Sequence, residues 1–387
     1  MKKFTILVTV VLFSLLLLAC RPPVPDVEQA IEDADTTTIV PLSNEETDAY
    51  FRSALPFVSS PTRGLIYGSI SNRADIEQVE QSLLRIATDF FDPEDYFFRE
   101  GQFLTRDFVI NILRAHNPEP ELASESITGL NPAFGTEVTF DTQTFESTPS
   151  QPIRPIAYVL EQNFVIIKDD EFQLEGVAIA IALNPYYREI NQATGWDHHF
   201  RMRDEELIEI GQQAATRLLP LLRRQEGLED VPIMIGLFIL RRDIDVLPGH
   251  FASVAIAEAN RAAIGSWQMI QEEHFSLPSA EINRYDIGIN DEFNFFSNTI
   301  GTAFIHQHGL TARAQVVDQN VYRVNITFNM TFLGFSEKIA FFQLLEQEVI
   351  RFSPEYDIRI IVRSPDTIHG AVVRRPHAQP SVTRISW

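Results

Sequence analysis

Cys20 has the clearest chemistry in this sequence, because it is the only cysteine in 387 residues and it ends an apolar segment. A basic start, Met1–Lys3, precedes an uncharged run, Phe4–Leu18, and the run closes in Leu17-Leu18-Ala19-Cys20. This order is typical of a lipoprotein signal peptide cut between Ala19 and Cys20, whose thiol then takes a diacylglyceryl group. The run is shorter than the ~18 to 20 apolar residues that span a bilayer. The alternative is an uncleaved membrane anchor with an incidental cysteine.

The histidines offer two pairs that could bind a metal ion. His198 and His199 follow Trp196 and Asp197, and His306 lies two residues before His308. Zinc in proteins takes three or four ligands, and neither pair has a third ligand at a telling spacing. We therefore expect packed or solvated histidines and no metal site. A metal-binding protein or an extracellular hydrolase that uses these histidines is the weaker alternative.

Motifs that carry well-known chemistry are absent from the sequence. It contains no G-x-S-x-G, no Walker A and no H-E-x-x-H motif, and no dinucleotide-binding fingerprint between a strand and a helix. After Cys20 no thiol remains for nucleophilic work or for a disulfide within the chain. We expect no catalytic residues and no cofactor, so the sequence predicts a protein that is not an enzyme.

The segment 184–203 mixes aromatic rings, guanidinium groups and imidazoles. Tyr, Trp and Arg dominate the energetics of binding surfaces, so this composition predicts a recognition surface. The predicted ligand-binding surface consists of Tyr186, Tyr187, Arg188, Trp196, His198, His199, Phe200 and Arg201. The alternative is a loop that folds back and packs the same side chains against its own domain.

The charge balance restricts the partners. The formal net charge is −22, and removal of the signal peptide takes away Lys2 and Lys3 and no acidic residue. Nucleic acids and anionic lipids are bound through positive charge, so neither is an expected partner of the mature chain.

Apolar patterns predict the elements that position these residues. Asn72 precedes a helical spacing that runs to about Thr88, and Thr105 precedes a second short helix. Val138–Phe140 is a candidate strand. The runs Leu174–Leu183 and Val231–Leu240 are rich in apolar residues and predict buried strands.

Similar patterns follow in the second half of the chain. Asp204 starts a predicted helix, and Ser336 is the predicted cap of a later one. Tyr322–Phe332 alternates apolar and polar residues, which is typical of a half-buried strand. Thr302–His306 is a further predicted strand.

We predict an α+β fold built from a tandem repeat of strand-strand-helix-strand-strand-strand units, with a smaller N-terminal α/β region. Two unrelated α+β units are the alternative. The predicted divisions are the signal peptide 1–19, a disordered tether 20–48, the N-terminal region 49–150, repeat 1 at 151–277 and repeat 2 at 298–387.

Several segments, taken together and in order, resemble one protein family. They are Arg63-Gly64-Leu65 with Asn72-Arg73 and Asp75, then Phe98–Leu104, Gly129–Pro132, Gly227–Ile233, Pro248–Phe251 and Ile264–Trp267. As a set they resemble the CamS family, lipoproteins of Gram-positive bacteria that are called sex pheromone precursors. The resemblance covers the chain from about residue 50 to its end, together with the lipobox.

The resemblance implies a tandem α+β duplication and a signal peptide that is trimmed to a short hydrophobic mating pheromone in some members. The matching stretch here is Phe13–Ala19, which is apolar and ends in a small residue. It has a leucine run where isoleucine and phenylalanine are expected. A peptide-pheromone precursor that releases residues 13–19 to signal in plasmid conjugation is therefore the alternative function.

The main prediction is a lipid-anchored protein on the outer face of the cytoplasmic membrane, with a non-enzymatic binding or envelope role for the folded part. Its expected partners are the membrane, through a lipid on Cys20, the enzymes that process lipoproteins, and an unidentified ligand or envelope protein.

Overall fold

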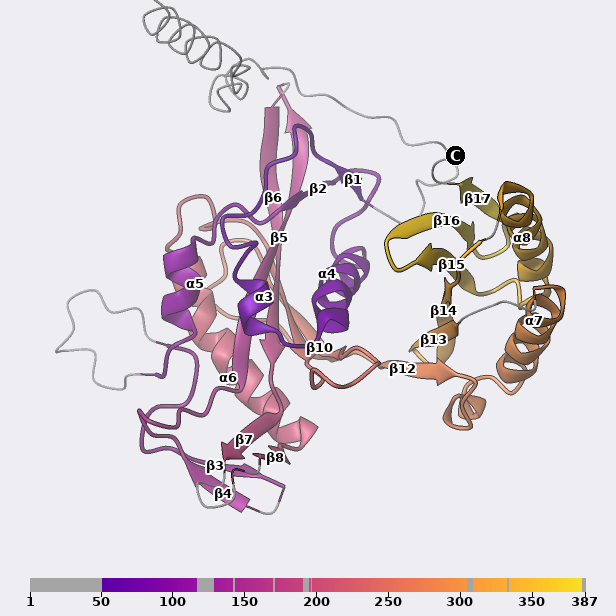
Figure 1. The fold of residues 1–387 in the computed structure, drawn as a ribbon. Coiled ribbons are helices and arrows are strands. Elements are labelled where there is room, and N and C mark those ends of the chain that lie inside the picture. Colours follow the sequence, from indigo (N-terminus) through magenta and orange to yellow (C-terminus); the bar gives the residue numbers. More distant parts are fainter. Residues whose placement is uncertain are drawn as a thin grey trace, which may run out of the picture.

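The chain forms two α+β units, each with its own sheet and hydrophobic core (Figure 1). The structure, a computed structural model, describes residues 51–116, 129–141, 143–169, 171–190, 195, 197–304, 309–332 and 334–384. The expected α+β class is confirmed. The predicted signal peptide, Cys20 and the tether lie outside the described residues.

The first unit contains a sheet in the order β1-β2-β5-β6-β9-β10-β11 and two small hairpins, β3-β4 and β7-β8. Its strands are β1 (Arg52–Ser53), β2 (Phe97–Glu100), β3 (Glu137–Phe140), β4 (Gln143–Glu146), β5 (Ile156–Lys168), β6 (Glu171–Leu183), β7 (Tyr186–Ile190), β8 (Asp197–Arg201), β9 (Ile233–Ile239), β10 (His250–Ala257) and β11 (Gln268–Met269). Its helices are α3 (Ile66–Ser69), α4 (Arg73–Ala87), α5 (Arg106–Ile112) and α6 (Asp204–Leu222).

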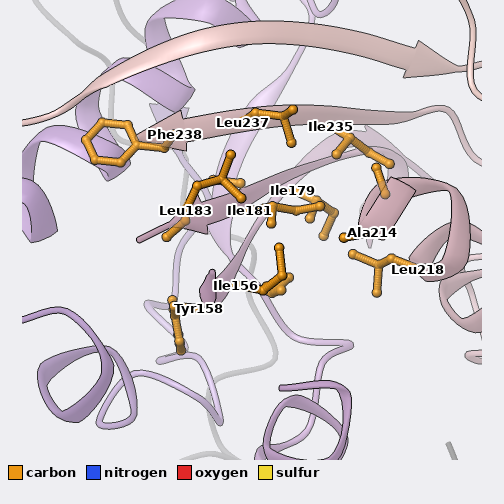
Figure 2. Packing of buried hydrophobic residues seen from close by; sticks show 14 of the residues in the cluster. Ile156, Tyr158, Ile179, Ile181, Leu183, Ala214, Leu218, Ile235, Leu237 and Phe238 are labelled. Carbon is orange, nitrogen blue, oxygen red and sulfur yellow. The ribbon is translucent and has the colours of Figure 1, made fainter. Parts of the chain in front are cut away.

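The two expected buried strands, β6 and β9, lie in the middle of this sheet because helices cover both of its faces. Leu237 of β9 faces Gly211 of α6, whereas its neighbour Gly236 faces Leu83 of α4. Successive side chains of a strand point to opposite faces, so α4 and α6 cover opposite faces of the sheet. Figure 2 shows Leu218 of α6 in the same cluster as Ile235.

Two predicted N-caps are confirmed in this unit. The Asn72 side chain accepts a hydrogen bond from the backbone N–H of Ala74 (2.8 Å), and the Thr105 hydroxyl accepts one from Phe108 N–H (3.2 Å). Each side chain satisfies a donor that the first turn of the helix leaves without a partner.

The second unit has the sheet order β12-β13-β14-β15-β16-β17, and α7 and α8 lie side by side against it (Figure 1). Its elements are β12 (Glu272–Leu277), a 3-10 helix (Glu281–Arg284), α7 (Ile289–Ala303), β13 (Leu310–Val317), β14 (Asn320–Asn329), α8 (Phe335–Glu348), a 3-10 turn (Val349–Arg351), β15 (Asp357–Ser364), β16 (Thr367–Arg374) and β17 (Ser381–Arg384). The alternating pattern of β14 buries Val324, Ile326 and Phe328 in the core.

Both sheets contain five strands with the same pairing. In β5-β6-β9-β10-β11 and in β13-β14-β15-β16-β17 the successive pairs are antiparallel, parallel, antiparallel and antiparallel. A helix, α6 or α8, occupies the connection between the two parallel strands in each case. This common order agrees with an internal repeat, whereas descent of both units from one duplication stays a prediction.

Three expectations differ from the structure. Thr302 and Ala303 end α7 instead of starting a strand, because Ile289, Phe293, Phe296 and Ile300 recur at helical spacing and are buried together. Residues 305–308 lie outside the described part. The predicted repeat 1 ends at residue 277 and so includes β12, which instead pairs with β13 of the second sheet. Helix α8 begins after Gly334, and Ser336 lies within it.

The two units meet at Glu272, the first residue of β12, whose side chain is fully buried. It accepts hydrogen bonds from Ser82 Oγ of α4 (2.7 Å), from Gln315 Nε2 of β13 (2.5 Å) and from the backbone N–H of Phe251 in β10 (3.3 Å). The Arg85 guanidinium lies 3.4 Å away. One carboxylate therefore connects elements of both sheets.

The surroundings keep Glu272 ionised. Burial by itself would raise the pKa of Glu272, but the neighbouring His274, Arg85 and Ser82 together lower that pKa from 4.5 to about 2. A buried carboxylate is stable only when donors and a cation surround it, so this cluster is sensitive to the loss of the negative charge.

We expect Glu272→Gln to lower the free energy of unfolding by about 3 kcal/mol at pH 7. This is the free energy that corresponds to a fall of the carboxylate pKa from 4.5 to about 2 on folding. Because the pKa is lower in the folded state, this stabilisation is complete above pH 4.5 and is lost as the pH falls toward 2. Urea unfolding at several pH values measures the difference between the variant and the wild type.

The control is Glu273→Gln, which changes the adjacent carboxylate, whose side chain is 46% exposed. This substitution should change stability little, since exposed ion pairs contribute little. Equal losses of unfolding free energy in both variants would contradict the role of the buried charge. So would a difference in unfolding free energy between Glu272→Gln and the wild type that stays the same between pH 5 and pH 3.5.

Candidate functional site

Most of the predicted surface forms the β7-β8 hairpin, which is inserted between β6 and α6. The Asn184 side chain fixes its start by accepting from Tyr186 N–H (3.0 Å) and donating to Tyr186 O (3.1 Å). At the other end, Arg201 N–H donates to the Asp141 carboxylate (2.9 Å). The hairpin is thus tied to the rest of the first unit at both ends.

The register of the hairpin divides the predicted residues between two faces, since directly opposite residues in an antiparallel pair share a face. Tyr187 lies opposite Phe200, and Glu189 lies opposite His198. On the other face, Tyr186 lies opposite Arg201, and Arg188 lies opposite His199.

The first of these faces packs against the β3-β4 hairpin. The ring centroid of Tyr187 lies 5.3 Å from that of Phe140 and 4.5 Å from that of Phe145. Phe200 lies 4.9 Å from Phe145. Tyr187 and Phe200 therefore follow the alternative prediction, in which the segment packs its aromatic side chains against its own domain. His198 is exposed at the end of this face.

The second face borders a groove with a volume of about 510 Å³, which we call the hairpin groove. Tyr186, Arg188 and His199 form the hairpin wall of the groove, and the loop 241–244 after β9 forms the loop wall. The complete lining is Ser69, Ser71, Ala157, Asn184, Tyr186, Arg188, Asp197, His199, Leu240, Arg241, Arg242, Asp243 and Ile244. Aromatic, guanidinium and imidazole groups from two distant segments thus share one concave surface.

Residues at the start of α4 hold the loop wall in place. The buried Asp75 carboxylate accepts hydrogen bonds from Arg241 N–H (2.7 Å) and Gly249 N–H (2.6 Å). Asn72 donates to the carbonyls of Arg242 (2.8 Å) and Asp245 (3.0 Å). Burial raises the pKa of Asp75 to about 6, although the two backbone donors oppose this rise. These hydrogen bonds within the protein therefore hold the loop wall in position without any bound ligand.

Arginines outnumber aspartates among the side chains that line the groove. Its lining includes three arginines, Arg188, Arg241 and Arg242, and two aspartates, Asp197 and Asp243. The Arg188 guanidinium contacts Asp197 at 2.7 Å. Arg242 also has an acidic partner, Asp245, so two of the three arginines are paired with aspartates.

Arg242 is also positioned by an aromatic ring of the hairpin. The Arg242 guanidinium lies 5.8 Å from the ring centroid of Tyr186 and pairs with Asp245 at 3.2 Å. A cation over a ring is held by the ring's quadrupole, so Tyr186 couples the hairpin wall to the loop wall.

The structure does not bring His198 and His199 together, because they point to opposite faces of β8. Among the described residues, no group of three or more His, Cys, Asp or Glu side chains could hold a metal ion. Trp196, His306, His308, Ala19 and Cys20 lie outside the described residues.

Sequence reasoning missed the loop wall of the groove. Arg241 and Arg242 are about 40 residues from the hairpin, and adjacent arginines after a strand carry no signal of their own. Only the family resemblance pointed indirectly to this loop. Asp75 and Gly249 belong to two of the family-like segments, and the Gly249 N–H donates a hydrogen bond to the Asp75 carboxylate.

The comparison with protein families decides which family the chain represents. A model described as the CamS sex pheromone cAM373 precursor matches residues 57–380. The chain belongs to the CamS family. The resemblance expected from the separate segments is thereby confirmed, and this family is described as a pheromone precursor rather than by an enzymatic activity.

Two solved structures share the CamS fold with this chain. One is the C-terminal domain of the sex pheromone staph-cAM373 precursor from Staphylococcus aureus, with 21% identity and a TM-score of 0.69 over 82% of this chain and 99% of that chain. The other is a sex pheromone precursor from Lactobacillus salivarius subsp. salivarius UCC118, with 19% identity and a TM-score of 0.75 over 90% of this chain and 99% of that chain. A search of curated proteins finds no match. Within the described ranges, no helix has both the length and the apolar character needed to cross a membrane.

The two neighbouring tyrosines should behave differently when they are replaced. Tyr187→Ala should lower the free energy of unfolding by about 3 to 5 kcal/mol, since it empties a buried aromatic cluster. Tyr186→Ala should cost about 1 kcal/mol or less, the loss of one cation–π contact. Thermal or urea unfolding measures both values, and a larger loss for Tyr186→Ala would show that the two faces are assigned the wrong way round.

Proposed function

We propose that this CamS-family chain is a lipid-anchored protein on the outer face of the cytoplasmic membrane, and that its folded part binds a small extracellular ligand without catalysis. The anchor is a diacylglyceryl group on Cys20, added by lipoprotein-processing enzymes before cleavage after Ala19. The only cysteine of the chain, at the end of an uncharged apolar run, supports this anchor.

The binding role depends mainly on one observation. Tyr186, Arg188 and His199 share one face of the β7-β8 hairpin, and they line the same groove as Arg241 and Arg242. Side chains on rigid strands and on a loop held by buried hydrogen bonds lose little freedom when a ligand binds, which favours affinity.

The expected ligand carries an acidic group next to a flat or apolar part. Guanidinium groups bind carboxylates and phosphates through paired N–H donors, and the groove has more arginines than aspartates. Tyr186 offers a ring face beside these donors. At physiological salt, charges more than about 8 Å away are largely screened, so the acidic remainder of the chain does not prevent local binding of an anion.

Replacing the predicted lipid attachment residue tests the anchor. Cys20→Ala should move the protein from the membrane fraction to the medium or leave it as an unprocessed precursor, because the lipid is the proposed attachment. Globomycin, which blocks the lipoprotein signal peptidase, should cause the precursor to accumulate. Fractionation and immunoblotting measure both outcomes. If neither Cys20→Ala nor globomycin changed the processing of the protein or its retention in the membrane fraction, the proposed lipid anchor would be contradicted.

Titration of the groove with two small anions tests the binding role. For the chain from residue 20 onward with Cys20→Ser, we expect inorganic phosphate or benzoate to shift NMR signals of the hairpin and of the loop 241–244. Arg188→Ala should weaken this binding about tenfold or more, the effect of losing one charged hydrogen bond. The matched control is Arg154→Ala, which removes an exposed arginine outside the groove. Equal affinity in both variants would remove the groove as the binding site.

A second candidate function rests on the description of the family as a pheromone precursor together with the apolar stretch Phe13–Ala19. In this reading the signal peptide is trimmed to a released peptide, independently of what the folded part binds. A synthetic peptide of residues 13–19 should then induce plasmid transfer in a responder strain at low concentration. A peptide of the same composition in scrambled order is the control, and equal responses to both would count against a specific pheromone.

A further inference from the structure

The second sheet has one face that points away from α7 and α8. Phe328 of β14 packs against Phe296 of α7 and Phe341 of α8, so its neighbours Thr327 and Asn329 point to the opposite face. A cavity with a volume of about 320 Å³ lies over this opposite face, and we call it the sheet-face cavity. The complete lining is Glu77, Val246, Leu247, Ser276, Thr311, Ala312, Arg313, Asn325, Thr327, Ile361 and Arg363.

The register of the strands brings polar side chains of this lining together. Arg313 of β13 lies directly opposite Ser276 of β12 and directly opposite Asn325 of β14. Thr311 and Thr327 lie opposite each other, two residues further along the same strands. Directly opposite side chains share a face and lie about 5 Å apart, and the next side chain on that face is about 7 Å away. One guanidinium, one amide and three hydroxyl groups therefore form a continuous polar surface.

Arg313 lies in the middle of this polar surface and is partly buried. It makes no hydrogen bond or ion pair with any residue that the structure describes. Its nitrogen atoms are not sealed in the interior, unlike Nε of Arg85 and of Arg217, so a molecule in the cavity can reach them. Burial lowers the pKa of Arg313, and the exposed Glu77 opposes this change. An arginine keeps its charge in proteins, so the cavity contains a cation that an anion can pair with.

The other polar groups of the lining are also available. Within the described ranges, the amide and the three hydroxyl groups of the polar surface make no hydrogen bond. Arg363 donates from Nε to the side chain of Asn329 (2.9 Å) and has no acidic partner among the described residues, so its other two nitrogens remain for a ligand. The lining includes one carboxylate, that of Glu77, which accepts from Gln81 at 3.0 Å. Two guanidinium groups thus share the cavity with a single carboxylate.

This set of donors fits a phosphate group better than a carboxylate. Guanidinium groups bind both anions through paired N–H donors. A phosphate monoester presents three acceptor oxygens and about 1.5 to 2 negative charges at pH 7, whereas a carboxylate presents two oxygens and one charge. The cavity offers two guanidinium groups, one amide and three hydroxyl groups, so a carboxylate would leave more of these donors without a partner.

Apolar side chains adjoin the donors. Val246 and Leu247 belong to the loop between β9 and β10 of the first unit, and Ile361 belongs to β15 of the second unit. The side chains of Val246 and Ile361 are 81% and 43% exposed, so a ligand that covers them removes apolar surface from water. A cavity of about 150 Å³ is enough for benzene, so one of 320 Å³ accommodates a phosphate together with a ring-sized apolar group.

We propose that the sheet-face cavity binds an organic phosphate monoester, with the phosphate on Arg313, Ser276 and Asn325 and the apolar part against Val246 and Leu247. The loop of the two apolar residues and the sheet of the three donors belong to different units, so the ligand contacts both units. The sheet-face cavity and the hairpin groove have no lining residue in common. Either site can therefore fail to bind without the other.

The test is an NMR titration of the chain from residue 20 onward, carrying Cys20→Ser, with phenyl phosphate, inorganic phosphate and benzoate. We expect phenyl phosphate to shift the signals of Ser276, Arg313 and Asn325. Benzoate should bind there about tenfold more weakly, the effect of losing one charged hydrogen bond. Inorganic phosphate should also bind more weakly, since it has no apolar part to cover the loop. Equal affinity for benzoate would overturn the phosphate class, equal affinity for inorganic phosphate would overturn the apolar contact, and no shift of these signals would overturn the site.

Arg313→Gln separates a binding role from a structural one. The variant should bind phenyl phosphate about tenfold or more weakly, while its melting temperature should stay the same or rise, since a charge that burial opposes is removed. If Arg313 were only structural, the melting temperature would fall and the affinity of the folded variant would not change. The matched control is Arg188→Ala, which removes an arginine of the hairpin groove and should leave the shifts of Ser276 and Asn325 unchanged. An equal loss of these shifts in the control would contradict a separate site.

A second variant keeps the test decisive if Arg313→Gln does not fold. Ser276 is exposed and its hydroxyl makes no hydrogen bond with the described residues, so Ser276→Ala should not affect folding. It should weaken the binding of phenyl phosphate about threefold to tenfold, the effect of one hydrogen bond. Unchanged affinity in Ser276→Ala, together with unchanged affinity in Arg313→Gln where that variant folds, would place the phosphate elsewhere on the chain and overturn the proposal.

Discussion

A single buried negative charge determines how the two halves of this molecule fit together. Glu272 begins the first strand of the second sheet, and it accepts hydrogen bonds both from α4 and β10 of the first unit and from Gln315 of its own sheet. Such a cluster adds less net stability than apolar packing would, because each group loses its hydration. It adds directionality, since hydrogen bonds require particular angles whereas apolar contacts do not.

The segments that resemble the CamS family are mostly parts of similar buried polar contacts. Glu161, for example, accepts from the backbone N–H groups of Phe103 and Leu104, which belong to one of these segments. Asn131, in another, accepts from Ile156 N–H. These contacts explain why the resemblance could be recognised in short, separate pieces. They also explain why it is informative about the fold and says little about the ligand, which would be bound by residues outside most of the segments.

The sequence predicted the elements whose patterns are local. The buried runs of β6 and β9, the alternation of β14 and the caps Asn72 and Thr105 could all be read from neighbouring residues. The candidate site was predicted only in part, because a list of residue types does not contain the register of a hairpin. Tyr186 and Tyr187 are chemically identical, and only the pairing with Arg201 and Phe200 assigns one to the groove and the other to the core. The loop with Arg241 reaches the groove through long-range contacts with α4 that no local pattern records.

The position of the β7-β8 hairpin has an evolutionary consequence. It lies in the connection between β6 and α6, whereas the equivalent connection in the second unit, from the end of β14 at Asn329 to the start of α8 at Phe335, is short. The sheet pairing is the same in both units, so the hairpin is an addition that the sheet does not need. Relatives can therefore lengthen, shorten or exchange this connection without changing their scaffold, and the groove becomes an interchangeable part of the molecule.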